Sequence, residues 1–312
     1  MGVSFSELRA VCQLPVASRN DVAGLLFGDR CSLPITKLFV DQGLSPSIAT
    51  VGMLVTGVLG SALQLGGELA AIAGAALLVL YYLLDCVDGE VARWHRIEHA
   101  LWGYYEYIFH FVVKPLVYLC LGFALWSSSG STLYLVACVS AAVATLWLKL
   151  FFAVPSLVFV GSVLRGSASA ERPYRAYLTP ARERAAAPAE PVPGAGGEVF
   201  RLRLDRVTLR SLMTNFDIGL VLLLLACVLD LLIDPVQAPL LGPLEARGAW
   251  LLWYGLVLPI DFVDYLRTFV RNRHFDQTMV QLLARADGFA LRPDDEGEGA
   301  DPPDADVDRS GS

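Results

Sequence analysis

The chain has 312 residues, of which 55% are hydrophobic and only 18% are charged, and its mean hydropathy is +0.52. This composition excludes a water-soluble globular protein, because no soluble core needs so much apolar sequence. The formal net charge of −7 equals that of the tail Pro293–Ser312, which has eight acidic residues and one arginine. The rest is neutral overall, and nothing predicts a nucleic-acid partner.

Residues 1–43 come before the first apolar run and are predicted to form a cytosolic N-terminal arm. Within it, residues 19–39 mix apolar and charged positions, which predicts a short amphipathic helix on the membrane surface. An ordinary solvated arm is the alternative. The sequence lacks the pattern of a cleavable signal peptide, so the first membrane span is the expected targeting signal.

Six windows poor in charge follow, and each can supply most of the roughly 20 residues that a bilayer helix needs. We therefore expect an all-α polytopic membrane protein with six transmembrane helices in a membrane domain of residues 44–285. The fourth window exceeds one span and is expected to bend or end near Pro155. The windows are Ile48–Leu65, Leu69–Leu84, Tyr107–Ser127, Thr132–Val163, Ile218–Ile233 and Ala249–Val270.

The orientation follows from the basic residues. They precede the first span, follow the second, crowd the segment after the fourth and follow the sixth, whereas the opposite connections hold only Arg247. The positive-inside rule then places both termini in the cytosol. Residues 165–211 are predicted to form a flexible basic cytosolic loop, and residues 286–312 an acidic disordered tail.

The end of the second span carries the most informative motif. Asp85, Asp88, Gly89, Ala92 and Arg93 follow the spacing Asp-x2-Asp-Gly-x2-Ala-Arg. This pattern resembles the first half of the signature of the CDP-alcohol phosphotransferases, membrane enzymes that make phospholipids and related phosphodiesters. Five fixed residues at this spacing make a specific match.

The second half of the motif keeps the family's spacing but changes the residues. Trp102, Glu106 and His110 stand where the family has a glycine and two aspartates. The stretch Ser45–Thr50, at the mouth of the first span, is similar to the Thr-Pro-Asn-x-x-Thr with which many members begin theirs. The chain therefore resembles a divergent member of that family.

The placement of the charged residues also predicts a site without reference to the family. Asp85 and Asp88 are three residues apart, and Glu106 and His110 are four apart, so each pair shares a helical face. Because the second and third spans are antiparallel and joined by a short cytosolic turn, the two faces are expected to meet near the inner surface. Buried charges need partners or a cavity, which predicts a polar pocket open to the cytosol.

Two further charged residues are expected at a similar depth. Asp217 opens the fifth span at its cytosolic end, and Lys149 lies in the inner half of the fourth. Lys149 is a candidate contact for the acceptor or a phosphate, and an interfacial lysine that snorkels toward water is the alternative.

The resemblance implies transfer of a substituted phosphoryl group from a CDP-linked alcohol, such as CDP-diacylglycerol, to an acceptor alcohol with release of CMP. It implies Mg²⁺ or Mn²⁺ as cofactor, a nucleotide contact at Gly89, Ala92 and Arg93, and His110 or Glu106 as the base. Membrane lipids are expected partners, and the resemblance allows a homodimer. The metal ligands that it implies are Asp85, Asp88, Glu106 and His110.

Two other readings stay open. A catalytically inactive scaffold of the same fold that binds nucleotide or lipid would be consistent with the altered second half of the motif. An ion-coupled transporter would account for the intramembrane charges, although not for Gly89, Ala92 and Arg93 at their spacing.

Overall fold

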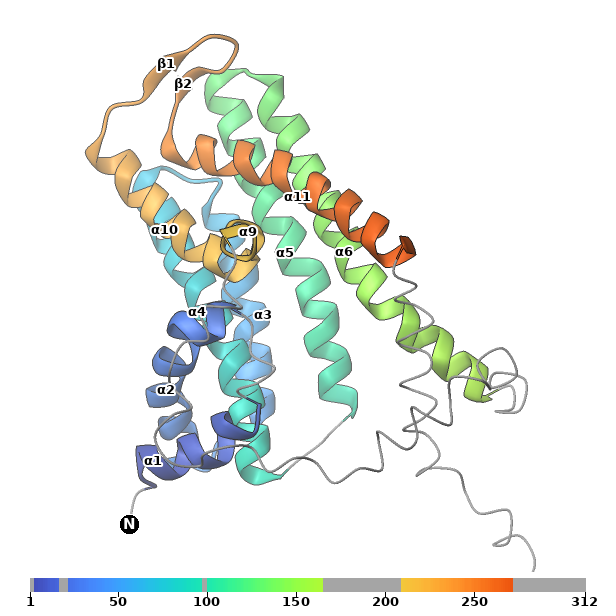
Figure 1. Ribbon diagram of the computed structural model, residues 1–312. Coiled ribbons are helices and arrows are strands. Elements are labelled where there is room, and N and C mark those ends of the chain that lie inside the picture. The colour runs from blue at the N-terminus through green and yellow to red at the C-terminus, as the bar shows by residue number, and fades with distance from the viewer. Residues whose placement is uncertain (1–2, 17–21, 97–99, 165–208, 272–312) are drawn as a thin grey trace, which may run out of the picture. The chain divides into compact units, whose positions relative to one another are not determined.

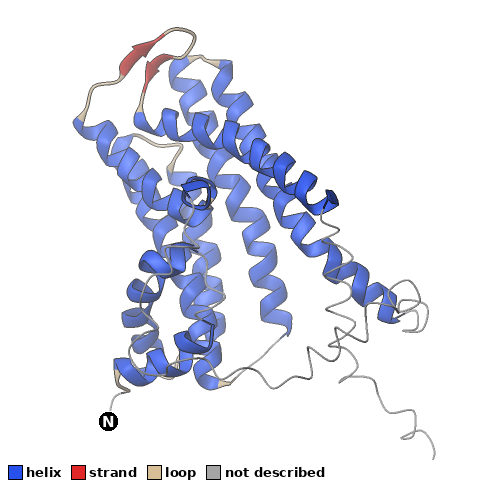
Figure 2. Cartoon of the chain, viewed as in Figure 1, coloured by secondary structure: helices blue, strands red, loops and turns tan. Residues whose placement is uncertain are grey.

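The computed structural model describes residues 3–16, 22–96, 100–164 and 209–271, and within these ranges the chain is mostly helical (Figures 1 and 2). Most of the predicted basic loop and the whole acidic tail lie outside the described residues. The helices are α1 Phe5–Leu8, α2 Asp29–Asp41, α3 Pro46–Leu63, α4 Glu68–His95, α5 Ala100–Ser129, α6 Thr132–Leu164, α9 Leu209–Thr214, α10 Phe216–Leu232 and α11 Ala246–Arg271, and the strands are β1 Val236–Ala238 and β2 Gly242–Leu244.

The chain divides into two compact units. The first comprises residues 1–153 and 192–269 and contains α1 to α5, most of α6, and α9 to α11. The second comprises residues 154–191 and 270–312, of which only the end of α6 and the last two residues of α11 are described. All the residues that form the candidate site belong to the first unit.

Five helices are long and apolar enough to cross a membrane, which confirms the prediction of a helical multi-pass membrane protein. They are α3, α4, α5 over Tyr104–Ser129, α6 over Thr132–Phe151, and α11. The other predicted span corresponds to α10, which has 17 residues. Helix α6 does not end near Pro155 but continues to Leu164, since a proline within a helix removes one hydrogen bond without having to terminate it.

Helix α4 holds the motif and is longer than a bilayer requires. Its 28 residues extend about 42 Å, against a hydrocarbon core of about 30 Å, so its last turns can reach past the apolar region. Arg96 ends the helix in the left-handed conformation with φ of 54°. The first half of the motif, from Asp85 to Arg93, is therefore helical throughout.

Close contact between α3 and α4 fixes the position of α4, the helix that carries the first half of the motif. Ser45 caps the start of α3 by accepting a hydrogen bond from the Ser47 amide, and Pro46 occupies the first turn. Further along, a Cβ atom added at Gly60 would lie 2.8 Å from the Gly74 carbonyl oxygen. The two backbones therefore touch at a position where both helices have no side chain, as small residues allow in membrane proteins.

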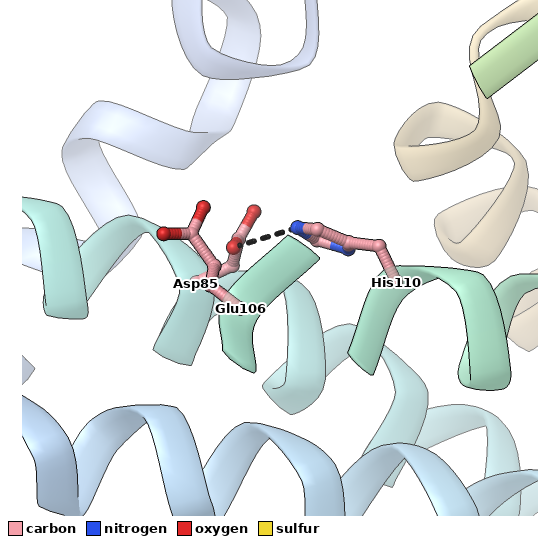
Figure 3. A group of neighbouring side chains, drawn as sticks. All are labelled: Asp85, Glu106 and His110. Carbon is pink, nitrogen blue, oxygen red and sulfur yellow. Dashed lines mark ion pairs between the residues drawn. The ribbon is translucent and has the colours of Figure 1, made fainter. Parts of the chain in front are cut away.

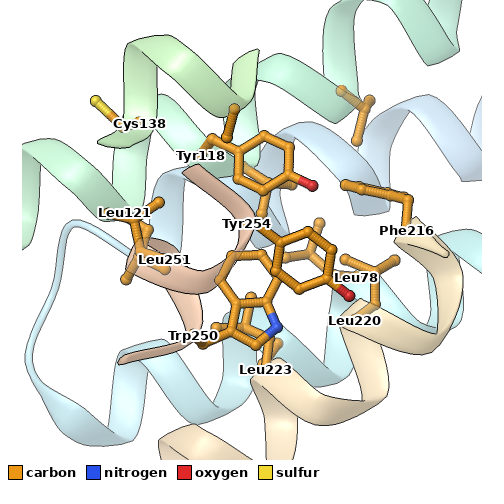
Figure 4. Close-up of a cluster of buried hydrophobic side chains, with 14 of the residues drawn as sticks. Leu78, Tyr118, Leu121, Cys138, Phe216, Leu220, Leu223, Trp250, Leu251 and Tyr254 are labelled. Carbon is orange, nitrogen blue, oxygen red and sulfur yellow. The ribbon is translucent and has the colours of Figure 1, made fainter. Parts of the chain in front are cut away.

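An aromatic core joins α5, α10 and α11 (Figure 4). The rings of Tyr118 and Trp250 stack at 5.6 Å between centroids, and Trp250 and Tyr254 lie 4.6 Å apart. The Trp250 indole donates to the Gly219 carbonyl at 2.9 Å, which satisfies the polar atom of this buried ring.

A short hairpin, which the sequence patterns did not predict, connects α10 to α11. Strand β1 pairs antiparallel with β2. Between the two helices, the Asp230 carboxylate accepts hydrogen bonds from the backbone amides of Ala246 and Arg247. It also accepts one from Arg247 Nε at 2.7 Å. Arg247, read from sequence as a loop residue, is therefore buried and paired at the start of α11.

The N-terminal arm packs on α4, and its helix α2 confirms that part of residues 19–39 is helical. The face of α2 toward α4 carries the buried residues Ser32, Thr36 and Phe39, while Leu38 is exposed. Much of the inward face is thus polar. It meets a charged stretch of α4, which explains why hydroxyl groups rather than leucines are buried there.

We predict that Gly60→Ala destabilises the bundle, because the added methyl group would meet the Gly74 backbone, which cannot move aside as a side chain can. The cost expected for such overpacking is about 1–3 kcal/mol. Thermal unfolding in detergent measures it as a lower midpoint.

The matched control is Gly52→Ala on the same helix, where the added Cβ meets only the tip of the Leu84 side chain at 3.2 Å. Equal midpoints for the two variants would contradict the close contact between α3 and α4.

Candidate metal and nucleotide site

Two helices that follow each other in the chain bring together three metal-ligating side chains (Figure 3). Asp85 lies in the second half of α4, and Glu106 and His110 lie one turn apart on α5. One ligand atom of each residue lies within 4.8 Å of the others. The predicted convergence of Asp85 with Glu106 and His110 is therefore present in the structure.

His110 is held by contacts at both ring nitrogens. Its Nε2 lies 3.1 Å from Asp85 Oδ1, and its Nδ1 is 2.5 Å from the hydroxyl oxygen of Tyr81. Tyr81 is fully buried on α4, one turn before Asp85, and its ring meets the imidazole edge-on. Because Nδ1 is engaged by the tyrosine, only Nε2 faces the carboxylates.

The Asp85 carboxylate has one buried oxygen beside His110. Asp85 Oδ1 lies 3.1 Å from His110 Nε2, at ion-pair distance. Buried carboxylate oxygens normally have a donor or a cation as partner. The oxygen is therefore suitably placed to bind an ion.

Asp88, the second predicted carboxylate ligand, does not belong to the three-residue group. Three residues advance an α-helix by about 300°, so Asp88 is displaced by about 60° around α4 from Asp85. It is 7% exposed and contacts Thr50 of α3, whereas Asp85 faces α5. The two aspartates of the motif thus meet different helices.

Gly89 and Arg93 lie one turn apart and are coupled sterically. A Cβ atom added at Gly89 would lie 3.0 Å from Arg93 Nη1, so the glycine leaves room for the guanidinium group. The Arg93 Nε donates to the Cys12 carbonyl at 2.6 Å. One edge of the guanidinium therefore holds the N-terminal arm, while its terminal nitrogens lie over Gly89.

A cavity of about 280 Å³ adjoins the site. Its volume is close to the lower end of small-molecule sites, which measure roughly 300–1,000 Å³. Motif residues from α4, Glu106 from α5, Asp217 from α10 and several residues of the N-terminal arm form the walls. The lining residues are Gln13, Val16, Gly24, Asp29, Tyr82, Asp85, Cys86, Gly89, Glu90, Arg93, Glu106 and Asp217.

Other predicted site residues lie outside this lining. Ala92 is partly buried on α4 but is not among the described residues that line the cavity. Lys149 on α6 is half-buried, with its ammonium group 5.0 Å from the centre of the Tyr107 ring, and Tyr107 donates to the Lys149 carbonyl at 3.2 Å. The contact of Lys149 with a ligand stays a prediction.

Three parts of the site were not singled out from the sequence. Tyr81 gave no signal because an aromatic residue in an apolar run looks like ordinary packing. Glu90 falls at a variable position of the motif, and Gln13 lies far away in the arm. Asp217 was expected at the right depth, and the structure places it in the cavity wall, with Lys114 Nζ 3.9 Å from its Oδ1.

Comparison with known proteins assigns no family to this chain. No protein-family model matches it, and no curated protein matches it. The interpretation of the site therefore depends on its own geometry and on the resemblance of the motif.

We predict that Asp85→Asn weakens binding of Mn²⁺ by at least about tenfold, because the amide keeps the shape of the side chain but loses its charge. Even the replacement of residues that only hydrogen-bond to a metal ligand commonly weakens metal binding about tenfold or more. Titration of Mn²⁺ followed by electron paramagnetic resonance gives the dissociation constant.

Asp234→Asn is the control, since Asp234 is exposed after the end of α10. A wild-type affinity in the Asp85 variant would rule out the proposed ligand group.

Proposed function

We propose that the protein is a metal-dependent CDP-alcohol phosphotransferase. It would transfer a substituted phosphoryl group from a CDP-linked alcohol, such as CDP-diacylglycerol, to the hydroxyl of an acceptor alcohol and release CMP. The supporting observation is the convergence of Asp85, Glu106 and His110 beside a cavity that Gly89 and Arg93 also line. The motif thus supplies charged groups of both signs to the lining of one cavity.

The donor set fits a divalent cation. One ligand atom from each of two carboxylates and one imidazole lies within 4.8 Å of the others, and the buried Asp85 Oδ1 lies 3.1 Å from His110 Nε2. Carboxylates suit Mg²⁺ and Mn²⁺, and an imidazole favours Mn²⁺ of the two. A bound cation would neutralise negative charge on the pyrophosphate as the bond to CMP breaks.

We assign the transfer of the acceptor's proton to His110. In the tautomer whose Nδ1–H donates to the Tyr81 hydroxyl oxygen, Nε2 can either accept a proton or bind a cation, but it cannot do both at once. As a base, Nε2 takes the proton from the acceptor hydroxyl. The acceptor oxygen then bonds to the phosphorus next to the donor alcohol, and CMP leaves with the electron pair of the broken bond.

The remaining motif residues bind and orient the donor in this proposal. The terminal nitrogens of Arg93 can hold donor phosphate oxygens, and Gly89 keeps space for them. Asp85 and Glu106 supply carboxylates to the cation. The resemblance assigns the same role to Asp88 and a nucleotide contact to Ala92, and Glu106 is the second candidate for the base.

In the membrane, we propose six spans, which are the five helices named above and α10, the fifth span in chain order. Its 17 residues measure about 26 Å and require the flanking turns to complete the crossing. The excess of basic residues on one side places both termini and the site in the cytosol. Soluble nucleotide and membrane lipid can then meet at one surface.

A catalytically inactive scaffold that binds nucleotide is the second candidate. The observation that favours it is the altered second half of the motif, in which Glu106 and His110 replace aspartates and His110 is already held by Tyr81 and Asp85. Such a protein would keep the cavity and bind CDP without turning it over.

The test is metal-dependent release of CMP by the purified protein in nanodiscs, with CDP-diacylglycerol and soluble CDP-alcohols as donors and pooled alcohols as acceptors. We expect release that requires Mg²⁺ or Mn²⁺ and an acceptor. Replacing His110 by alanine should lower turnover by roughly 10²–10⁴-fold, the usual contribution of a general base, with CDP still bound.

The matched control is His95→Ala, which changes an exposed histidine at the end of α4 and should leave turnover unchanged. If the wild type binds CDP but releases no CMP from any donor, the scaffold reading replaces the enzyme. Cation-dependent uptake into vesicles, with no CDP binding, would instead identify a transporter.

A further inference from the structure

A buried carboxylate outside the metal group ties the N-terminal arm to α4. Glu90 is 2% exposed and lies five residues after Asp85. Its Oε1 accepts hydrogen bonds from Gln13 Nε2 at 2.7 Å and from the Ser32 hydroxyl at 2.8 Å. Its Oε2 accepts a hydrogen bond from the Thr36 hydroxyl. Three donors from two separate segments of the arm thus converge on one side chain.

This arrangement sets the position of the arm because each partner needs the other. A carboxylate is costly to bury unless donors surround it, and the hydrogen bonds that it accepts are stronger than those between neutral groups. Conversely, Gln13, Ser32 and Thr36 are themselves buried and would lose their acceptor if the arm moved. Any displacement of the arm would leave polar groups without partners on both sides.

Two neighbouring hydrogen bonds reinforce the same contact. Arg93 Nε donates to the Cys12 carbonyl at 2.6 Å, and Gln13 Nε2 donates to the Asp29 carbonyl at 2.6 Å. The Gln13 amide has two N–H groups, which are used by Asp29 and Glu90, so its orientation is fixed.

The residues held in this way are also residues of the cavity wall. Gln13 and Asp29 line the cavity from the arm, opposite Asp85 and Glu106. Glu90 itself reaches the lining, but its two carboxylate oxygens are engaged by donors of the arm. The cavity therefore exists in its present form only while the arm is docked.

We propose that Glu90 is a positioning residue that clamps the N-terminal arm onto α4, so that the arm forms one wall of the cavity for the CDP-linked donor. The inference depends on the proposed function for the identity of the ligand, and on geometry alone for the clamp. Glu90 takes no part in bond making or breaking, and acts through Gln13 and Asp29. Without the clamp, the wall opens and the nucleotide binds less tightly.

The arm contains a natural reporter of docking. Cys12 is fully buried beside the clamp, whereas Cys31 on α2 is exposed. Burial, and next the negative charge of Glu90, raise the pKa of the Cys12 thiol to about 11. The thiol is therefore both shielded and protonated at neutral pH, and a maleimide should react with it only when the arm leaves α4.

The experiment compares Glu90→Ala with Glu68→Ala, which removes an exposed carboxylate at the opposite end of α4. Both changes are made in full-length protein in nanodiscs in which Cys12 is the only cysteine, the others being alanine. We expect the Glu90 variant to react with maleimide at least about tenfold faster than the parent, and to bind CDP with Mn²⁺ at least about tenfold more weakly. The Glu68 variant should match the parent in both.

Thr36→Val provides a milder test that preserves side-chain shape and Glu90 itself. It removes one donor and should raise maleimide reactivity in the same direction by a smaller factor. A parallel set that retains only Cys31 should react equally in all variants, which separates undocking from general unfolding.

If Cys12 reacts at the parent rate in both Glu90→Ala and Thr36→Val, the proposal that Glu90 holds the arm on α4 is wrong. Faster reaction with unchanged affinity for CDP would show that the arm is docked by Glu90 but is not a wall of the donor site. A parent protein that binds no CDP would contradict the proposed function and the donor part of the inference, while the reactivity of Cys12 would still decide the clamp.

Discussion

The structure depends on how the charged end of α4 is satisfied at the edge of an apolar bundle. Four charged side chains follow one another over fewer than three turns, and together they meet three different neighbours. Asp85 faces His110 of α5, Asp88 contacts Thr50 of α3, and Glu90 accepts hydrogen bonds from the N-terminal arm. Arg93 donates to a carbonyl of the same arm. Because an unpaired charge here is costly, these contacts fix which segments surround α4.

That distribution explains why a cavity forms at this place. Apolar packing holds the other parts of the bundle together, with the Gly60 and Gly74 backbones in contact between α3 and α4 and the aromatic core around Trp250 joining α5, α10 and α11. Near the end of α4, by contrast, the lining of the cavity includes five carboxylates, one arginine and two glycines. Such a lining suits a ligand that carries phosphates together with a divalent cation.

The sequence was sufficient to predict the long apolar helices and the convergence of Asp85 with Glu106 and His110, because both follow from the distribution of charge along the chain and from short turns between antiparallel helices. It did not reveal that Asp88 faces α3, since spacing alone does not say which neighbour occupies each side of a helix. Nor did it reveal the pairing of Glu90 with Gln13, which are 77 residues apart and carry no local pattern that links them. The burial of Arg247 was missed for the same reason, because its partner Asp230 lies on another helix.

The central claim is that the carboxylates at the end of α4 and the start of α5 hold a cation against the phosphates of a CDP-linked donor. Pulsed electron-nuclear double resonance on the protein with Mn²⁺ and CDP tests it most directly, because coupling between Mn²⁺ and ³¹P appears only at short distance. We predict a ³¹P coupling in the wild-type protein that disappears in Asp85→Asn at the same concentrations. Bound Mn²⁺ without a ³¹P coupling, or a coupling that the Asp85 variant retains, would contradict the account.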